Sequence, residues 1–148
     1  KEYDINCNDM LVGIAASGTT PYVLGGISDA KAHGILTVGI TNNPGSPLAQ
    51  SADIPIEVNV GPEFLTGSTR MKSGTSQKLV LNMISTALMI RVGRVKGNKM
   101  VNMQLSNTKL VDRGTRYIME ELGLDYEEAE KALKKYGSVK LAIDALKK

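Results

Sequence analysis

Four consecutive residues combine hydroxyl side chains with a glycine where the chain passes from an apolar run into a second apolar pattern: Ser17, Gly18, Thr19 and Thr20. The run before them, Met10–Ala16, is typical of a buried strand, and Pro21 suits the first turn of a helix. Such a helix start offers free N–H groups and the positive end of its dipole, and hydroxyls add donors without charge. The pattern predicts a phosphate site, with simple capping of the helix as the alternative.

A second polar loop, residues 66–75, again precedes a long helical pattern and carries Ser68, Thr69, Arg70 and Lys72. An arginine binds phosphate or carboxylate in a fork, whereas a lysine acts as a compact point charge. The alternative is a polar loop that ends in Ser73 as a helix cap. Two hydroxyl-rich loops before helices favour ligand binding more than either loop does alone.

Two carboxylates lie close to these loops. Glu57 falls in a third apolar segment, and Glu63 lies in the second loop. Either serves as an acid or a base if burial raises its pKa. The alternative for Glu57 is a strand residue that faces solvent, and for Glu63 a structural role in its loop. The one histidine, His33, is expected to contact carbonyls at a helix end.

The elements that position these residues form an α/β pattern. The run 35–41 predicts a second buried strand after the first helix, and Ile54–Val60 a third. Continuous apolar strands joined by helices favour a parallel sheet. Ser73–Arg91 predicts a long helix that is apolar on most of its circumference, so we expect it to pack on several sides. Its apolar window is too short to span a bilayer, and no membrane association is expected.

The composition of the chain changes beyond Gly97. Residues 106–122, 127–136 and 138–147 predict three short helices, with Asp125 and Ser138 as caps. We therefore expect two domains, residues 1–104 and 105–148.

Composition narrows the classes of function. A single cysteine and a single histidine argue against an internal disulfide, a Cys- or His-based metal site and a hydrolytic triad. The net charge of +3 is spread over interleaved acids and bases without an aromatic platform, which does not favour nucleic-acid binding. The chain starts at Lys1 with no visible leader, so we expect a fragment or a processed chain.

Several motifs resemble one family closely. V-G-I-A-A-S-G-T-T-P-Y-V (Val12–Val23) is similar to the sugar isomerase (SIS) domain signature, in the form found in N-acetylmuramic acid 6-phosphate etherases. The run from Val60 to Met83 and the motif N-x-K-L-V-D-R (Asn107–Arg113) are more specific matches. The tail Ala129–Ile143 resembles the ubiquitin-associated-like (UBA-like) unit that ends these enzymes. The resemblance covers nearly the whole chain and identifies it as the C-terminal portion of such a protein.

This resemblance implies a partial parallel-sheet SIS domain of the flavodoxin-like, three-layer kind, followed by a three-helix UBA-like unit. It implies a cytoplasmic, dimeric lyase of cell-wall recycling that needs no metal or cofactor. The lyase cleaves the lactyl ether of N-acetylmuramic acid 6-phosphate to N-acetylglucosamine 6-phosphate and D-lactate, by elimination across C2–C3 and addition of water. The implied substrate-binding residues are Ser17, Gly18, Thr19 and Thr20, and in the second loop Ser68, Thr69 and Lys72. Glu63, which shortly precedes these residues of the second loop, is a further candidate for substrate binding because of its proximity.

One departure from the family pattern affects the expected activity. In the family, the catalytic glutamates come from an earlier β-α-β unit with its own G-x-G-T-S-G-R loop, and neither is found in this sequence. We therefore expect no catalysis by this polypeptide alone, and an exposed sheet edge that pairing with another chain would cover. The alternatives are a non-catalytic, regulatory sugar-phosphate-binding SIS domain and, more weakly, an aldose–ketose isomerase.

Overall fold

A computed structural model describes residues 4–147 of the chain. The chain divides into two compact units, the first ending at Met83 and the second beginning at Ile84. This division falls inside a helix, whereas the predicted domain boundary at residues 104 and 105 lies further along the chain. That boundary stays a prediction, and the two units are described separately below.

The first unit is built on a parallel sheet of three strands in the order β1-β2-β3: β1 (Met10–Ile14), β2 (Leu36–Thr41) and β3 (Ile54–Glu57). The predicted α/β class and the parallel sheet are thus confirmed. The third strand is shorter than the predicted Ile54–Val60, because the carbonyl of Val58 accepts a hydrogen bond from the side chain of Asn42 instead of a strand neighbour. Since all three strands run in one direction, their carboxyl ends meet at the same edge of the sheet.

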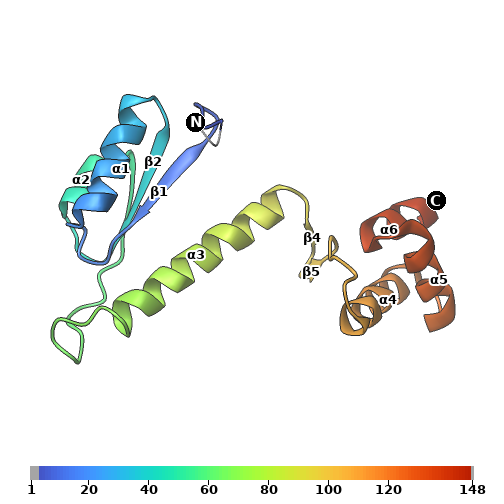
Figure 1. Cartoon of the computed structure of the whole chain (residues 1–148). Coiled ribbons are helices and arrows are strands. Elements are labelled where there is room, and N and C mark those ends of the chain that lie inside the picture. Colours follow the sequence, from blue (N-terminus) through green and yellow to red (C-terminus); the bar gives the residue numbers. More distant parts are fainter. Residues whose placement is uncertain (1–3, 148) are drawn as a thin grey trace. The chain divides into compact units, whose positions relative to one another are not determined.

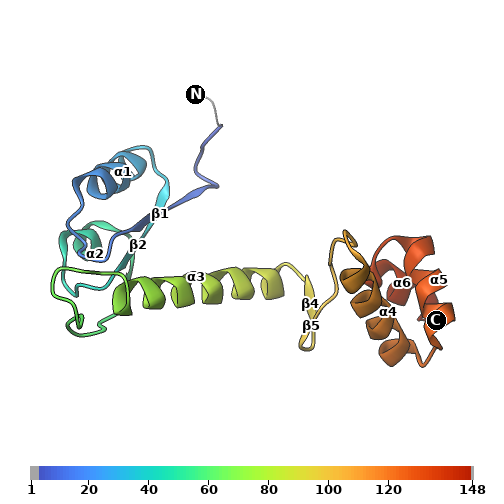
Figure 2. The same cartoon turned by 60° about the horizontal axis from the view of Figure 1, so that its bottom comes forward.

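Two helices that begin with proline, α1 (Pro21–Ala32) and α2 (Pro47–Ser51), connect the strands and pack against each other and the sheet (Figure 1 and Figure 2). Their core contains Ile27 and Leu48, both fully buried. The helices approach the strands closely, because a Cβ added at Gly39 would lie only 2.9 Å from Cβ of Ala52. As predicted, His33 contacts a helix-end carbonyl: its Nδ1 lies 2.8 Å from the carbonyl oxygen of Asp29. The third layer of the expected arrangement stays a prediction.

The long helix α3 (Lys72–Arg91) begins and ends close to its predicted bounds, but its environment differs from the prediction. We expected packing on several sides, yet among the described residues of the helix only Ser73 and Val80 are buried. Its large apolar side chains are mostly exposed: Leu79, Leu81, Met83, Leu88, Met89 and Ile90. The apolar pattern of the helix therefore exceeds what the rest of the described chain covers. No helix within residues 4–147 has the length and apolar character that a membrane span requires.

The second unit begins with a feature that the sequence analysis missed. Gly97-Asn98, interpreted as the end of a helix, instead connects the two strands of an antiparallel hairpin, β4 (Val95–Lys96) and β5 (Lys99–Met100), visible in Figure 2. Two-residue strands carry too little alternation for a pattern to reveal them.

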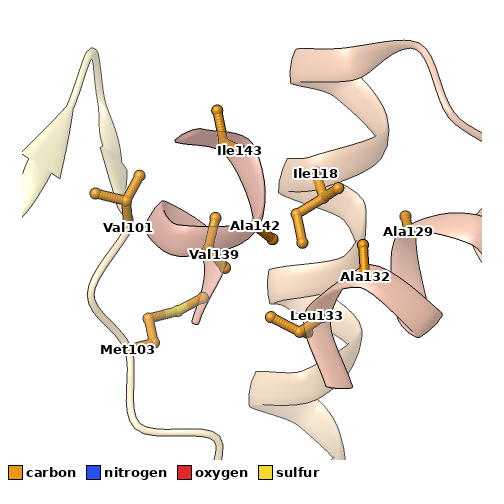
Figure 3. Close-up of a cluster of buried hydrophobic side chains, with 9 residues drawn as sticks. All are labelled: Val101, Met103, Ile118, Ala129, Ala132, Leu133, Val139, Ala142 and Ile143. Carbon is orange, nitrogen blue, oxygen red and sulfur yellow. The ribbon is translucent and has the colours of Figure 1, made fainter. Parts of the chain in front are cut away.

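Three helices follow, close to their predicted positions: α4 (Thr108–Leu122), α5 (Tyr126–Tyr136) and α6 (Val139–Leu146). Each begins at a side chain that accepts a backbone N–H: Asn107, Asp125 and Ser138. Their shared core (Figure 3) consists of Val101, Met103, Ile118, Ala129, Ala132, Leu133, Val139, Ala142 and Ile143. The likeness of this unit to a UBA domain stays a prediction.

A clamp of hydrogen bonds holds the amino-terminal edge of the sheet, opposite the strand ends described above. Oδ2 of Asp53 accepts from Oγ1 of Thr37 at 2.6 Å and from its backbone N at 3.0 Å, and Oδ1 lies 2.9 Å from Nζ of Lys31. Hydrogen bonds from the Thr37 hydroxyl, Lys31 and the Thr37 amide lower the pKa of Asp53 to about 2, against a slight opposing effect of desolvation.

We expect Asp53→Asn to lower the thermal midpoint of unfolding at neutral pH, because the charged partner of Lys31 is lost. A lowered folded-state pKa contributes stability above the ordinary value of 3.8, and this contribution disappears as the pH falls to about 2. The midpoints of the wild type and the variant should therefore converge over this range. Asp4→Asn, at an exposed side chain, is the control. A difference that does not depend on pH would contradict the assignment.

Candidate functional site

The first predicted loop folds as a compact turn at the carboxyl end of β1. The Oγ of Ser17 accepts from the backbone N of Thr19 at 3.3 Å and from its Oγ1 at 3.0 Å. A serine hydroxyl has two acceptor positions and one proton to donate. The hydroxyls of Ser17 and Thr19 thus hold each other in place, and both side chains are exposed. The turn therefore presents two neighbouring hydroxyls to solvent.

The start of α1 is open at the same place. Thr20 is the N-cap residue in an extended conformation, and its side chain makes no capping hydrogen bond. Pro21 at the first position has no N–H to satisfy. The alternative interpretation, in which Ser17 or Thr19 only caps the helix, differs from the structure, because the N-cap residue is Thr20 and the hydroxyls of Ser17 and Thr19 bond each other. The partial positive charge at this helix start is available to an anion.

A buried pair of hydroxyls forms the floor of the turn. Gly18 has φ of +65°, and a Cβ added there would lie 2.0 Å from Oγ of Ser46 and 2.7 Å from Oγ1 of Thr41. Ser46 and Thr41 are 3% and 0% exposed. The carbonyl of Gly18 accepts from the backbone N of Leu48 at 3.0 Å. Only glycine fits this position, both for its conformation and for the space beneath it.

The residues after β2 hold the turn in place, and the sequence analysis did not identify them as part of a site. The backbone N of Asn42 donates to the carbonyl of Ala16 at 3.0 Å, and Nδ2 of Asn43 donates to the carbonyl of Ser17 at 3.0 Å. In the sequence, the cluster of residues 42–46 (N-N-P-G-S) indicates only a turn. Its position directly after the second parallel strand was the signal, because it reaches the same sheet edge as Ser17.

In the second loop, Glu63 caps α3. Its Oε1 and Oε2 both accept from the backbone N of Lys72 at 3.0 Å, and Oε1 also accepts from the backbone N of Ser73 at 3.0 Å. The backbone amides of Ser73 and Lys72, in that order, lower the pKa of Glu63. The alternative interpretation made Ser73 the cap of this helix, but Ser73 lies inside the helix. The ammonium of Lys72 donates to the carbonyl of Pro62 at 2.8 Å, within its own loop.

The other predicted residues of this loop are arranged locally. Oγ of Ser68 accepts from the backbone N of Arg70 at 3.4 Å, and the carbonyl of Thr69 accepts from the backbone N of Gly74 at 2.9 Å. Arg70 and Thr69 are exposed. A groove of about 510 Å³ is lined by Glu63, Phe64, Leu65, Thr66, Gly67, Ser68, Arg70 and Met71. The structure thus gathers the predicted residues into two groups, one around Ser17 and one around Glu63.

Glu57, the second candidate carboxylate, is exposed and accepts a hydrogen bond from the backbone N of Gly45. It therefore holds the segment after β2, in addition to facing solvent as one interpretation expected. Among residues 4–147, no group of three or more His, Cys, Asp and Glu side chains is arranged to hold a metal ion.

Comparison with known proteins places this arrangement among its relatives. A family model described as the SIS domain matches residues 4–87. The chain is 67% identical over 146 residues to the N-acetylmuramic acid 6-phosphate etherase of Bacteroides fragilis, covering 99% of this chain and 52% of that protein. The corresponding etherase of Porphyromonas gingivalis is 62% identical over 145 residues, covering 98% of this chain and 53% of that protein. The chain spans about half the length of these curated relatives.

Solved structures agree with the fold. A protein of Clostridium difficile 630 described as a phosphosugar isomerase superimposes with a TM-score of 0.57 at 16% identity, covering 79% of this chain and 34% of that chain. At this level of identity the likeness concerns the fold alone.

We expect Gly18→Ala to destabilise the first unit more than Gly34→Ala, which serves as the matched control. Both glycines have positive φ, +65° and +71°, but a Cβ at Gly34 meets no atom within 4 Å. Each variant loses about 1–2 kcal/mol for the left-handed backbone. Gly18→Ala loses a further ~1–3 kcal/mol, because Ser46 must be displaced. Urea denaturation measures both, and equal losses would show that the floor beneath Gly18 yields freely.

Proposed function

The chain belongs to the SIS domain family, and from this premise we propose that it contributes the sugar-phosphate site of a carbon–oxygen lyase. The full-length protein cleaves the lactyl ether of N-acetylmuramic acid 6-phosphate to N-acetylglucosamine 6-phosphate and D-lactate, in the cytoplasm, as a step of cell-wall recycling. The observation that carries this proposal is the turn at Ser17–Thr20, which joins two exposed, mutually bonded hydroxyls to a helix start without a side-chain cap. The identity of 67% to a named etherase supports the choice of substrate.

The phosphate is held by the Ser17–Thr20 turn. The Ser17 hydroxyl donates to one phosphate oxygen, and the hydroxyls of Thr19 and Thr20 lie beside it on exposed backbone. The first turn of α1 adds the positive end of its dipole, whereas Pro21 has no N–H and the N–H of Val23 already donates to the carbonyl of Thr20. A dianion is thus neutralised by dipoles rather than by a cation. The second loop, with Glu63, Ser68, Thr69 and Lys72, lines the sugar side of the same ligand.

Acid–base chemistry is proposed to come from elsewhere in the full-length protein. Glu63 has a lowered pKa because backbone amides stabilise its carboxylate, whereas a general acid or base near neutral pH needs a raised one. Glu57 is bonded to the backbone N of Gly45. Both carboxylates therefore serve the backbone, and we propose that this chain alone binds the ligand without cleaving it.

We expect the full-length protein to release D-lactate from N-acetylmuramic acid 6-phosphate, and residues 1–148 alone to release none. In the full-length protein, Ser17→Ala should raise KM roughly 10- to 100-fold, because a hydrogen bond to a charged group contributes about 1.5–3 kcal/mol. Ser28→Ala, at an exposed position on α1, is the control. If the full-length protein binds the ligand but releases no D-lactate, the lyase hypothesis is wrong, and the hypothesis of a regulatory sugar-phosphate-binding domain remains.

We also propose that the full-length protein is a homodimer. In the described chain β1 is an edge strand, and a groove of about 510 Å³ runs along it beside α1. Apolar side chains line this groove, among them Leu11, Val12, Ile14 and Tyr22, and Tyr22 is 90% exposed. An open strand edge beside an apolar groove favours pairing with further polypeptide.

Light scattering of the full-length protein after gel filtration measures its mass directly. We expect twice the mass of one chain at micromolar concentration. A mass equal to one chain would contradict the dimer, while leaving the lyase proposal intact.

A further inference from the structure

The two groups of site residues are connected through one residue, Asn42. Its Nδ2 donates to the carbonyl of Val58 at 2.9 Å and to Oγ of Ser76 at 2.7 Å. Its Oδ1 accepts from Nε2 of Gln77 at 3.1 Å. Both donor positions and one acceptor position of this half-buried amide are thus used, and its three partners lie on two different segments of the first unit.

The backbone of the same residue faces the other group. The N–H of Asn42 donates to the carbonyl of Ala16, directly before the Ser17–Thr20 turn. Its neighbours continue this contact, because Oγ1 of Thr41 donates to the same carbonyl at 3.3 Å and Asn43 donates to the carbonyl of Ser17. Asn42 therefore bonds the first loop through its backbone and the start of α3 through its side chain.

The start of α3 in turn fixes the second loop. Glu63 bonds the backbone amides of Lys72 and Ser73, and the carbonyl of Thr69 accepts from Gly74. A shift of the first turns of α3 would therefore carry this loop with it. Among the described residues of the helix only Ser73 and Val80 are buried, so apolar packing against α3 is limited. The contacts of Asn42 with Ser76 and Gln77 bond the first turns of α3 to the segment after β2.

We propose that Asn42 is a positioning residue that aligns the loop before α3 with the Ser17–Thr20 turn, so that one sugar phosphate contacts both. This inference rests on the proposed function for its ligand, but the alignment itself does not. Inorganic phosphate needs only the Ser17–Thr20 turn, whereas N-acetylglucosamine 6-phosphate needs both loops. Misalignment therefore lowers the affinities for the two ligands unequally. General destabilisation of the fold would instead lower both affinities alike.

The test is calorimetric titration of the full-length protein with these two ligands. We expect Asn42→Ala to lower the affinity for N-acetylglucosamine 6-phosphate roughly 10- to 100-fold, since small misplacements of binding groups have effects of this size. The affinity for inorganic phosphate should change by less than about threefold. Ser76→Ala should act in the same direction, and the double variant should add little to Asn42→Ala, because both remove one contact. Equal weakening of both ligands, or of neither, would overturn the proposal.

A matched control is Asn6→Ala, which also removes an amide with several hydrogen bonds, all of them to residues within two positions. It should leave both affinities unchanged. Amide hydrogen exchange separates this inference from the proposed function. Asn42→Ala should accelerate exchange at residues 72–77, and Asn6→Ala should not. If the wild type binds neither ligand, the proposed function fails. If exchange at residues 72–77 is unaffected by Asn42→Ala, the positioning role of Asn42 fails.

Discussion

The first unit depends on how the end of β2 uses its hydrogen bonds. A parallel sheet brings the ends of its strands to one edge, but the loops that leave that edge have no ladder to hold them. Here the segment after β2 supplies the missing bonds. Its backbone and its asparagines bond the carbonyls of Ala16, Ser17 and Val58, while the side chain of Asn42 also bonds α3. Loop, floor and helix start are fixed by one short turn.

This turn explains why the candidate site needs no cation of its own. Hydroxyls and backbone amides bind an anion well only when they are oriented before the anion arrives. Ordering these groups during binding would cost conformational entropy and offset the free energy of the new hydrogen bonds. Ser17 and Thr19 bond each other, and the buried hydroxyls of Thr41 and Ser46 support Gly18 from below. The ammonium of Lys72 in the second loop donates to the carbonyl of Pro62. The proposed recognition of phosphate thus depends on geometry more than on net charge.

Much of this arrangement follows from the sequence, and the part that does not has physical causes. Local signals predicted the strand–loop–helix around Ser17, and the caps Asp125 and Ser138, because they depend on neighbours within a few positions. The role of Asn42 depends on partners more than thirty positions away, Ser76 and Gln77, which no local pattern reveals. Glu63 was considered as a site residue on its proximity, and only the structure shows that it caps α3. The resemblance supplied the substrate, which spacing alone does not determine.

The exposed apolar side chains of α3 illustrate the same difference between a local sequence pattern and the distant residues that contact it. Apolar residues around the whole circumference of a helix predict that it is buried, but they do not identify the segment that packs against it. In the second unit the rule operates as expected, because α4, α5 and α6 carry apolar stripes that meet in one core around Ile118 and Leu133. Leu79, Met83 and Ile90 have no comparable cover among the described residues, in a chain that spans about half the length of its curated relatives. Because the described residues give α3 little apolar packing, the polar bonds at its first turns help to place it, and this is why the half-buried amide of Asn42 matters to the geometry of the candidate site.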